Sequence, residues 1–204
     1  MTTTPPPNSP PDPHGTGAPS EWVQRWSHLV ARQGTVLDVA CGQGRHLRWF
    51  AQAQHRVTGV DRSPEAIESV AQLGEMVLAD IESGPWPFMA EGKPRQFDAV
   101  VVTHYLWRPL LPVIMQSVAE GGVLIYETFA VGNETVGKPA RADFLLRQGE
   151  LLGLCQELRV VAYEDGFLDA PARFVQRIVA VREHADTELP GRYSLRGSSS
   201  TFPG

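Results

Sequence analysis

Two glycines in a short turn, Gly42 and Gly44, stand where a ligand could reach the backbone. The stretch GTVLDVACGQGRHLRWFA (34–51) runs from a strand-like apolar segment through this turn into a helix-like segment. Glycine tolerates positive φ and has no Cβ, and the first turn of the following helix offers free N–H groups. A tight turn without a ligand is the plain alternative. Two glycines beside the small residues Ala40 and Cys41 favour a ligand-binding loop instead.

Acidic residues end three successive strand-like segments. Asp38 closes the first, and Asp61 closes the second, about 20 residues after the glycine turn, where an acid can accept hydrogen bonds from ribose hydroxyls. Asp80 closes the third and could accept from an adenine amino group, with the backbone N–H of Ile81 beside it. A helix cap for Asp61 and a solvated turn for Asp80 are the alternatives, although Ser63 already provides a cap. Together the three acids favour a nucleoside site.

The glycine spacing separates two kinds of nucleotide cofactor. A dinucleotide fingerprint, G-x-G-x-x-G, would need a third glycine at position 47, where the chain has Leu47. This absence disfavours a nicotinamide-dependent oxidoreductase, which remains an alternative. A non-catalytic nucleotide-binding protein of the same fold is another.

Strands and helices alternate along the chain, which is typical of a doubly wound α/β sheet with parallel strands. Two strand-like segments at the end, with Gly166 and Pro171 in the loop between them, predict an antiparallel hairpin. The predicted strands are 35–40, 56–61, 75–80, 96–106, 122–129, 158–165 and 173–182. The predicted helices are 21–33, 45–54, 63–73, a helix from 109 that ends at Gly121, and 144–154.

Composition narrows the class of protein. The chain has 204 residues and is 42% hydrophobic, enough for one substantial domain with its own core. The net charge of −5 argues against a nucleic-acid or membrane-surface partner, and no apolar run approaches the roughly 20 residues of a membrane span. Cys41 and Cys155 have neither disulfide nor metal spacing. We therefore expect a cytoplasmic protein without a metal, as a monomer or homodimer.

The two ends of the chain differ from the middle. Residues 1–19 are rich in Pro, Ser, Thr and Gly, and they lack the basic start and apolar core of a secretory signal. Residues 184–204 show no apolar periodicity either. We expect disordered tails over 1–19 and 184–204, and a single domain over 20–183.

Several segments resemble the motifs of class I S-adenosylmethionine-dependent methyltransferases. LDVACGQG resembles the first motif, acid-x-(Gly/Ala)-x-Gly-x-Gly, with Asp38, Ala40, Gly42 and Gly44 at its positions. VTGVDRS resembles the second motif, with Asp61 as the ribose ligand, and LADIE resembles the segment that reads adenine. FDAVVVTHYL and AEGGVLIYETF resemble the fourth and fifth strands. The resemblance covers about residues 34 to 130, and the later FLLRQGELLGL resembles the tellurite-resistance-type members.

This resemblance implies a Rossmann-like, seven-stranded mixed sheet of order 3-2-1-4-5-7-6, with strand 7 antiparallel. It also implies S-adenosylmethionine as the cofactor and methyl transfer to an acceptor, for which we expect a small molecule and no nucleic acid. The expected cofactor-binding residues are Asp38, Ala40, Cys41, Gly42, Gly44, Arg45, His46, Asp61, Arg62, Asp80, Ile81 and Thr103.

The resemblance implies that the segment THYLWRP, after the fourth strand, faces the transferable methyl group. His104 could act as a base and Tyr105 could pack on the sulfonium. Arg108 could hold an anionic acceptor, but Pro109 after it favours an outward position. We therefore expect His104 and Tyr105 to line the pocket. Glu127, Thr128 and Asn133 could form the opposite wall.

Overall fold

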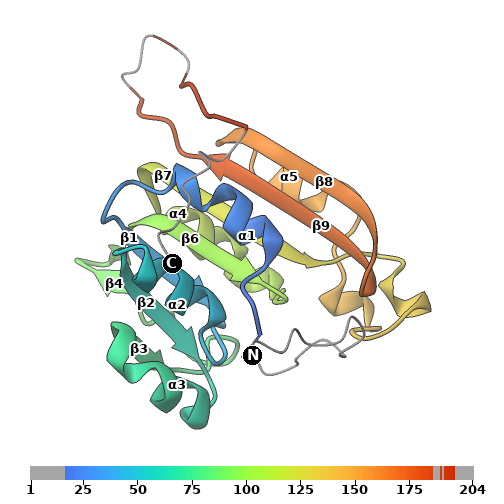
Figure 1. Cartoon of the computed structure of the whole chain (residues 1–204), viewed down its shortest axis with the longest axis horizontal. Coiled ribbons are helices and arrows are strands. Elements are labelled where there is room, and N and C mark those ends of the chain that lie inside the picture. The colour runs from blue at the N-terminus through green and yellow to red at the C-terminus, as the bar shows by residue number, and fades with distance from the viewer. Residues whose placement is uncertain (1–16, 186–188, 190, 196–204) are drawn as a thin grey trace, which may run out of the picture.

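Seven strands form one mixed sheet in the computed structural model, which describes residues 17–185, 189 and 191–195 (Figure 1). Their order is β3-β2-β1-β6-β7-β9-β8, and β9 lies antiparallel to both neighbours while β1, β2, β3, β6 and β7 run parallel. This is the predicted order, so the fold class is confirmed. The strands are β1 (Thr35–Val39), β2 (Arg56–Asp61), β3 (Glu75–Leu78), β6 (Phe97–Thr103), β7 (Val118–Phe129), β8 (Arg159–Asp169) and β9 (Ala172–Val181).

Helices cover both faces of this sheet, and Figure 1 shows α1 and α2 in front of it with α4 and α5 behind. None of the helices in the described ranges is long and apolar enough to cross a membrane. The α-helices are α1 (Glu21–Trp26), α2 (Arg45–Gln52), α3 (Pro64–Val70), α4 (Leu111–Gln116) and α5 (Glu150–Leu154). Short elements complete the described chain: η1 (Ser27–Leu29), η2 (Ala71–Leu73), η3 (Arg108–Leu110), η4 (Asn133–Thr135), η5 (Ala142–Phe144) and the small hairpin of β4 (Met89–Ala90) and β5 (Lys93–Pro94).

The central strands are buried on both faces because alternate residues enter two separate cores. In β1, Val36 packs with Trp22 and Phe50 on the α1–α2 face, whereas Leu37 packs with Ile114 on the α4–α5 face. A parallel strand covered on both faces needs a nearly continuous apolar run. The two cores hold the carboxyl ends of β1, β2, β3 and β6 at one rigid edge.

All five α-helices are shorter than predicted, and in two of them backbone pairing with distant segments takes over the end. The helix predicted to reach Gly121 ends at Gln116, since Val118 already pairs with Phe97 in the sheet. The helix predicted over 144–154 is confined to α5, because Leu146 exchanges backbone hydrogen bonds with Phe129 and Val131. In both cases long-range pairing overrides the local apolar pattern.

The final hairpin is tighter than predicted. β8 and β9 stay paired through Gly166 to Asp169 opposite Ala172, so the turn contains only Ala170 and Pro171. The predicted loop through Gly166 is therefore part of strand β8.

Some residues of the predicted C-terminal tail contact the domain. The Glu183 carboxylate accepts hydrogen bonds from Gly191 N (3.1 Å) and from the Tyr193 hydroxyl (3.3 Å). The His28 ring lies 3.0 Å from the Ser194 carbonyl oxygen. Residues 1–16, 186–188, 190 and 196–204 lie outside the described residues. The disorder expected for these parts of the two tails remains a prediction.

Candidate functional site

The glycine turn after β1 uses the left-handed conformation at three positions. Ala40, Gly42 and Gly44 have φ values of 54°, 52° and 71°. A Cβ on Gly44 would lie 2.6 Å from Val70 Cγ1, so a side chain there would be both strained and in collision. Cys41 N donates to Val60 O (3.0 Å), which ties the turn to β2.

Asp61 joins this turn to the start of α3. Its Oδ2 accepts a hydrogen bond from Gly42 N (2.8 Å) and its Oδ1 accepts one from Ser63 N (2.9 Å). Ser63 in turn caps the helix by accepting from Ala66 N (3.2 Å). Each oxygen of an ionised carboxylate can accept a further bond. Asp61 is therefore a fixed acceptor with capacity left for a ligand.

A cavity of about 130 Å³ opens beside Asp61 at the carboxyl ends of β1, β2 and β3, and we call it the Asp61 cavity. It lies where open α/β sheets bind ligands. Its lining residues are Ala40, Asp61, Arg62, Ala79, Asp80, Ile81, Glu82 and Tyr105. Five of the predicted cofactor ligands thus share one cavity.

Asp80 organises its own turn as well as lining this cavity. Its carboxylate accepts from the Ser83 hydroxyl (2.7 Å) and from Glu82 N (3.0 Å). The hydrogen bond from the Ser83 hydroxyl is the main reason that the pKa of Asp80 lies below its usual value, and the bond from Glu82 N adds to this effect. Asp80 therefore both stabilises a turn, as the alternative prediction had it, and lines the cavity.

A buried acid–imidazole pair lies beneath the turn. Asp38 is 1% exposed, and its Oδ2 has no hydrogen-bond partner among the described residues. His46 Nδ1 lies 3.8 Å from that oxygen and 3.5 Å from Thr103 Oγ1. Ser20 N donates to His46 Nε2 (3.2 Å), so the neutral ring carries its proton on Nδ1.

Burial sets the charge state of this pair. It raises the pKa of Asp38 to about 8, with Arg45 opposing the shift, and it lowers the pKa of His46 to about 3. His46 is therefore neutral at physiological pH. A hydrogen-bond donor or a cation bound beside Asp38 would stabilise its ionised form.

Cys41 acts as a packing residue. Its side chain is buried, and a Cβ on Gly59 would lie 2.9 Å from its sulfur. Burial, reinforced by Asp38 and Asp61, raises the pKa of the thiol. A buried neutral thiol is a poor nucleophile.

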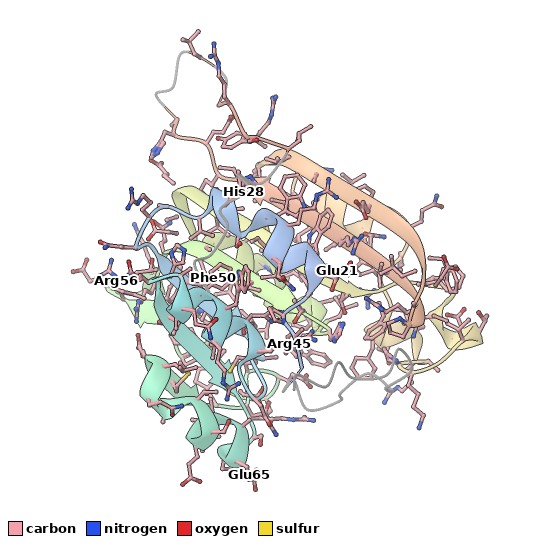
Figure 2. The ribbon with its side chains drawn as sticks, in the orientation of Figure 1. Glu21, His28, Arg45, Phe50, Arg56 and Glu65 are labelled. Carbon is pink, nitrogen blue, oxygen red and sulfur yellow. The ribbon has the colours of Figure 1, made fainter. Side chains whose placement is uncertain are left out.

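A second cavity, of about 60 Å³, lies on the other side of the loop after β6, and we call it the His104 cavity. Figure 2 labels Glu21 and Arg45, which reach it from the starts of α1 and α2. Its lining residues are Ser20, Glu21, Arg45, His104, Glu127, Arg173 and Arg177.

His104 has φ of 53°, and its ring stacks on Phe129 with centroids 5.1 Å apart. Its Nδ1 lies 3.4 Å from an Arg45 guanidinium nitrogen. Partial desolvation, followed by the charge of Arg45, lowers the pKa of His104. The ring is therefore neutral near pH 7.

Glu127 links three elements at this cavity. It is 2% exposed, and it accepts from Ser20 Oγ (2.9 Å) and from Arg177 (3.2 Å). Arg177 also donates to Glu164 at 2.5 and 2.8 Å. This network holds the N-terminal end of α1 against β7 and β9.

The predicted acceptor-side residues do not form one wall. Tyr105 lines the Asp61 cavity, whereas His104 lines the other one. Arg108 lines neither, because it forms a bidentate ion pair with Glu150 (2.7 and 2.9 Å) and donates to two backbone carbonyls.

The residues proposed for the opposite wall also separate. Thr128 is buried, and Asn133 donates to Pro139 O and accepts from Phe174 N. Glu127 alone of the three lines the His104 cavity.

Four residues of the His104 cavity were missed by sequence reasoning: Ser20, Glu21, Arg173 and Arg177. Ser20 was recognisable only as a helix cap. Arg173 and Arg177 lie four apart in a strand, which places them on the same face, and this alternation was the one available signal.

Residues 36–122 match the family described as "Methyltransferase domain". Among curated relatives, the tRNA U34 carboxymethyltransferase of Shewanella loihica is 28% identical over 138 residues, covering 60% of this chain and 42% of the relative. The enzyme of the same name from Vibrio cholerae is 27% identical over 200 residues, covering 89% and 61%. The chain thus spans about half the length of the curated relatives it matches.

Solved structures share the fold. TehB from Haemophilus influenzae has a TM-score of 0.59 at 20% identity, covering 74% of this chain and 58% of that one. A TehB-like S-adenosylmethionine-dependent methyltransferase from Corynebacterium glutamicum has a TM-score of 0.57 at 18% identity, covering 84% and 89%. Coclaurine N-methyltransferase bound to S-adenosylhomocysteine has a TM-score of 0.54 at 18% identity, covering 72% of this chain and 49% of that one. These names agree with the predicted cofactor.

The expectation of a small-molecule acceptor and no nucleic acid was wrong, because the curated relatives are named for transfer to tRNA. The net charge of −5 describes the whole chain and concealed the three arginines of the His104 cavity.

The sheet order, the glycine turn and the match over residues 36–122 lead to one assignment. The chain has the Rossmann-like fold that S-adenosylmethionine-dependent methyltransferases share, and its residues 36–122 match a methyltransferase domain.

Proposed function

We propose that the protein transfers a methyl group from S-adenosylmethionine to an acceptor that enters through the His104 cavity. The observation that carries this proposal is the Asp61 carboxylate, which lines the Asp61 cavity while Gly42 N and Ser63 N fix its orientation. A carboxylate held at this strand end suits the two hydroxyls of a ribose.

The residues present suit the rest of this cofactor. Ala40, Ala79 and Ile81 give the Asp61 cavity apolar sides, and Tyr105 adds an aromatic ring for a flat base. The buried Asp38 has an oxygen without a partner among the described residues, and this acceptor suits a methionine ammonium group.

In the proposed reaction the chain has to orient the reactants and exclude water. When bound, the cofactor supplies an electrophilic methyl group on a sulfonium that is already a good leaving group, so orientation and exclusion of water do most of the work. The Asp61 turn fixes the donor side. The loop after β6 separates the two cavities, and its residues Tyr105 and His104 lie one on each side.

His104 has an orienting role in this proposal. Desolvation and, after it, the adjacent Arg45 lower the pKa of His104, which makes its ring a weak base. A neutral ring stacked on Phe129 can position an acceptor by a hydrogen bond. An acceptor that needs no proton removed before transfer suits this geometry.

For the acceptor we propose tRNA. The curated relatives carry tRNA in their names, and arginine side chains at the His104 cavity suit a ligand that carries phosphates. Incubation with radiolabelled S-adenosylmethionine and total tRNA should label the RNA. Absence of label in RNA, with the cofactor bound, would contradict tRNA as the acceptor.

Calorimetry with three cofactors in parallel tests the donor. The purified chain should bind S-adenosylmethionine and S-adenosylhomocysteine, and it should not bind NAD. Binding of NAD alone would restore the oxidoreductase alternative, and binding of neither class would contradict the proposed function.

A further inference from the structure

The charges around the His104 cavity are unevenly compensated. Three arginines line it, Arg45, Arg173 and Arg177, beside the carboxylates of Glu21 and Glu127. Glu127 already accepts from Ser20 and Arg177, so its two oxygens are both engaged. The cavity therefore has more cationic than anionic character.

Arg177 is the arginine with the most complete compensation. Its guanidinium contacts Glu127 at 3.2 Å and Glu164 at 2.5 Å, and its side chain is 13% exposed. Two carboxylates satisfy one guanidinium in both charge and hydrogen bonds. Arg177 is thus a structural member of the cavity wall.

Arg173 differs from Arg177 although both project from β9. Its Nε is buried and has no hydrogen-bond partner in the part of the chain that the structure describes. Its NH1 donates only to a neutral group, the carbonyl of Pro171 (3.1 Å). No ion pair among the described residues includes Arg173. A guanidinium in this state lacks the anion that it would bind best.

The cationic groups converge on His104. Arg45 lies 3.4 Å from its Nδ1. Desolvation lowers the pKa of this ring most, Arg45 and Arg173 lower it further, and Glu127 raises it. The space beside it, about 60 Å³, exceeds the ~10–15 Å³ that one water needs. It is large enough for one small charged group and much smaller than the Asp61 cavity.

We propose that the His104 cavity is a subsite for an anionic oxygen group, a carboxylate or a phosphate, carried by the methyl acceptor, with Arg173 as its principal ligand. This inference rests on the proposed function, because the acceptor must approach the donor from this side. The guanidinium fork of Arg173 supplies paired donors for two oxygens of the group.

Inorganic phosphate and acetate serve as probes for the test. The full chain, saturated with S-adenosylhomocysteine, is titrated with each probe while the arginine Nε–Hε signals are followed by NMR. The Arg173 signal should shift with each addition, and R173Q should weaken probe binding at least tenfold. Arg141 is the matched control, because it pairs with Asp143 on the surface, and R141Q should bind the probes like the wild type.

Two results would overturn the proposal: equal probe binding by R173Q and wild type, or equal losses in R173Q and R141Q. R173K separates charge from geometry, and it should recover only part of the binding. Calorimetry with S-adenosylhomocysteine on the same samples keeps the two proposals distinct. If the wild type binds S-adenosylhomocysteine and R173Q does not change probe binding, the subsite alone is refuted. If the wild type does not bind S-adenosylhomocysteine, the proposed function is refuted.

Total tRNA added to the phosphate-loaded protein distinguishes the sources of the anion. Displacement of phosphate by tRNA assigns the subsite to a backbone phosphate. Displacement by acetate without displacement by tRNA assigns it to a carboxylate on the acceptor.

Discussion

The Asp61 cavity and the His104 cavity lie on the two sides of one loop, yet they are built in different ways. The Asp61 cavity comes from three short segments, residues 40, 61–62 and 79–82, each at the carboxyl end of a strand, together with Tyr105. The His104 cavity collects one or two side chains each from the start of α1, α2, the loop after β6, β7 and β9. A site at neighbouring strand ends is encoded locally, and a site between layers depends on the whole fold.

Their charges differ as well. Asp61, Asp80 and Glu82 face Arg62 in the first cavity, so acids predominate there. Arginines predominate in the second. This difference suits a cationic donor with ribose hydroxyls on one side and an anionic acceptor on the other. His104, which has a positive φ, and the next residue, Tyr105, line different cavities.

The largest effect on stability should come from the wall of the His104 cavity. R177Q leaves the buried Glu127 without its cation, and breaking such a pair costs about 3 kcal/mol in the free energy of unfolding. Arg25 is the control, because its pair with Glu164 is exposed and contributes about 0–1 kcal/mol. Urea unfolding of R177Q and R25Q measures both. Similar small losses in the two variants would show that the wall does not depend on this ion pair.

The largest effect on cofactor affinity should come from a substitution in the Asp61 cavity. D61A removes a carboxylate proposed to accept two ribose hydroxyls, and each charge-assisted bond contributes about 1.5–3 kcal/mol. Affinity for S-adenosylmethionine should fall at least tenfold in calorimetry. D169N, at the exposed hairpin end, should bind like the wild type. A folded D61A protein with unchanged affinity refutes the assignment.

The buried pair of Asp38 and His46 predicts a pH dependence of stability. Burial raises the pKa of Asp38 to about 8, so the folded state holds a proton that the unfolded state has released above its ordinary pKa. This contribution to stability is complete below about pH 4 and is lost as the pH rises through 8. His46 acts in the opposite direction, since its lowered pKa makes stability rise between about pH 3 and 6.5.

The window from pH 6.5 to 8 therefore isolates Asp38. Wild-type protein should lose stability across this window relative to D38N, as followed by unfolding in urea at several pH values. Parallel curves for the two proteins would mean that Asp38 is ionised in the folded state throughout.

A smaller effect is expected at Ser20, which belongs to the His104 cavity through two bonds. S20A removes the N-cap of α1 and the bond to Glu127, at a cost of about 1 kcal/mol. S20T keeps the hydroxyl and should recover most of the loss in thermal unfolding. No recovery in S20T would assign the effect to packing.

The Asp61 cavity was predictable because its signals are local. The glycine turn, Asp61 and the segment from Asp80 to Ile81 lie within 45 residues, each at a strand end that the apolar pattern already located. The sheet order followed from the same alternation and from the terminal hairpin. The ends of α4 and α5 were not predictable, because Val118 and Leu146 pair with distant backbone.

The His104 cavity was only partly predictable for a related reason. His104 and Glu127 follow strands and were identified, and Arg45 follows the glycine turn. Arg173 and Arg177 reach the cavity because β9 inserts beside β7, and Ser20 does so because α1 packs across both strands.

A crystal structure of the full chain with S-adenosylhomocysteine would show whether Asp61 binds the ribose of the cofactor. We expect the nucleoside in the Asp61 cavity, with both ribose hydroxyls about 2.5–3.0 Å from Asp61 oxygens and the sulfur directed toward the loop that carries Tyr105 and His104. A ligand bound elsewhere, or one bound without a contact between its ribose and Asp61, would contradict this expectation.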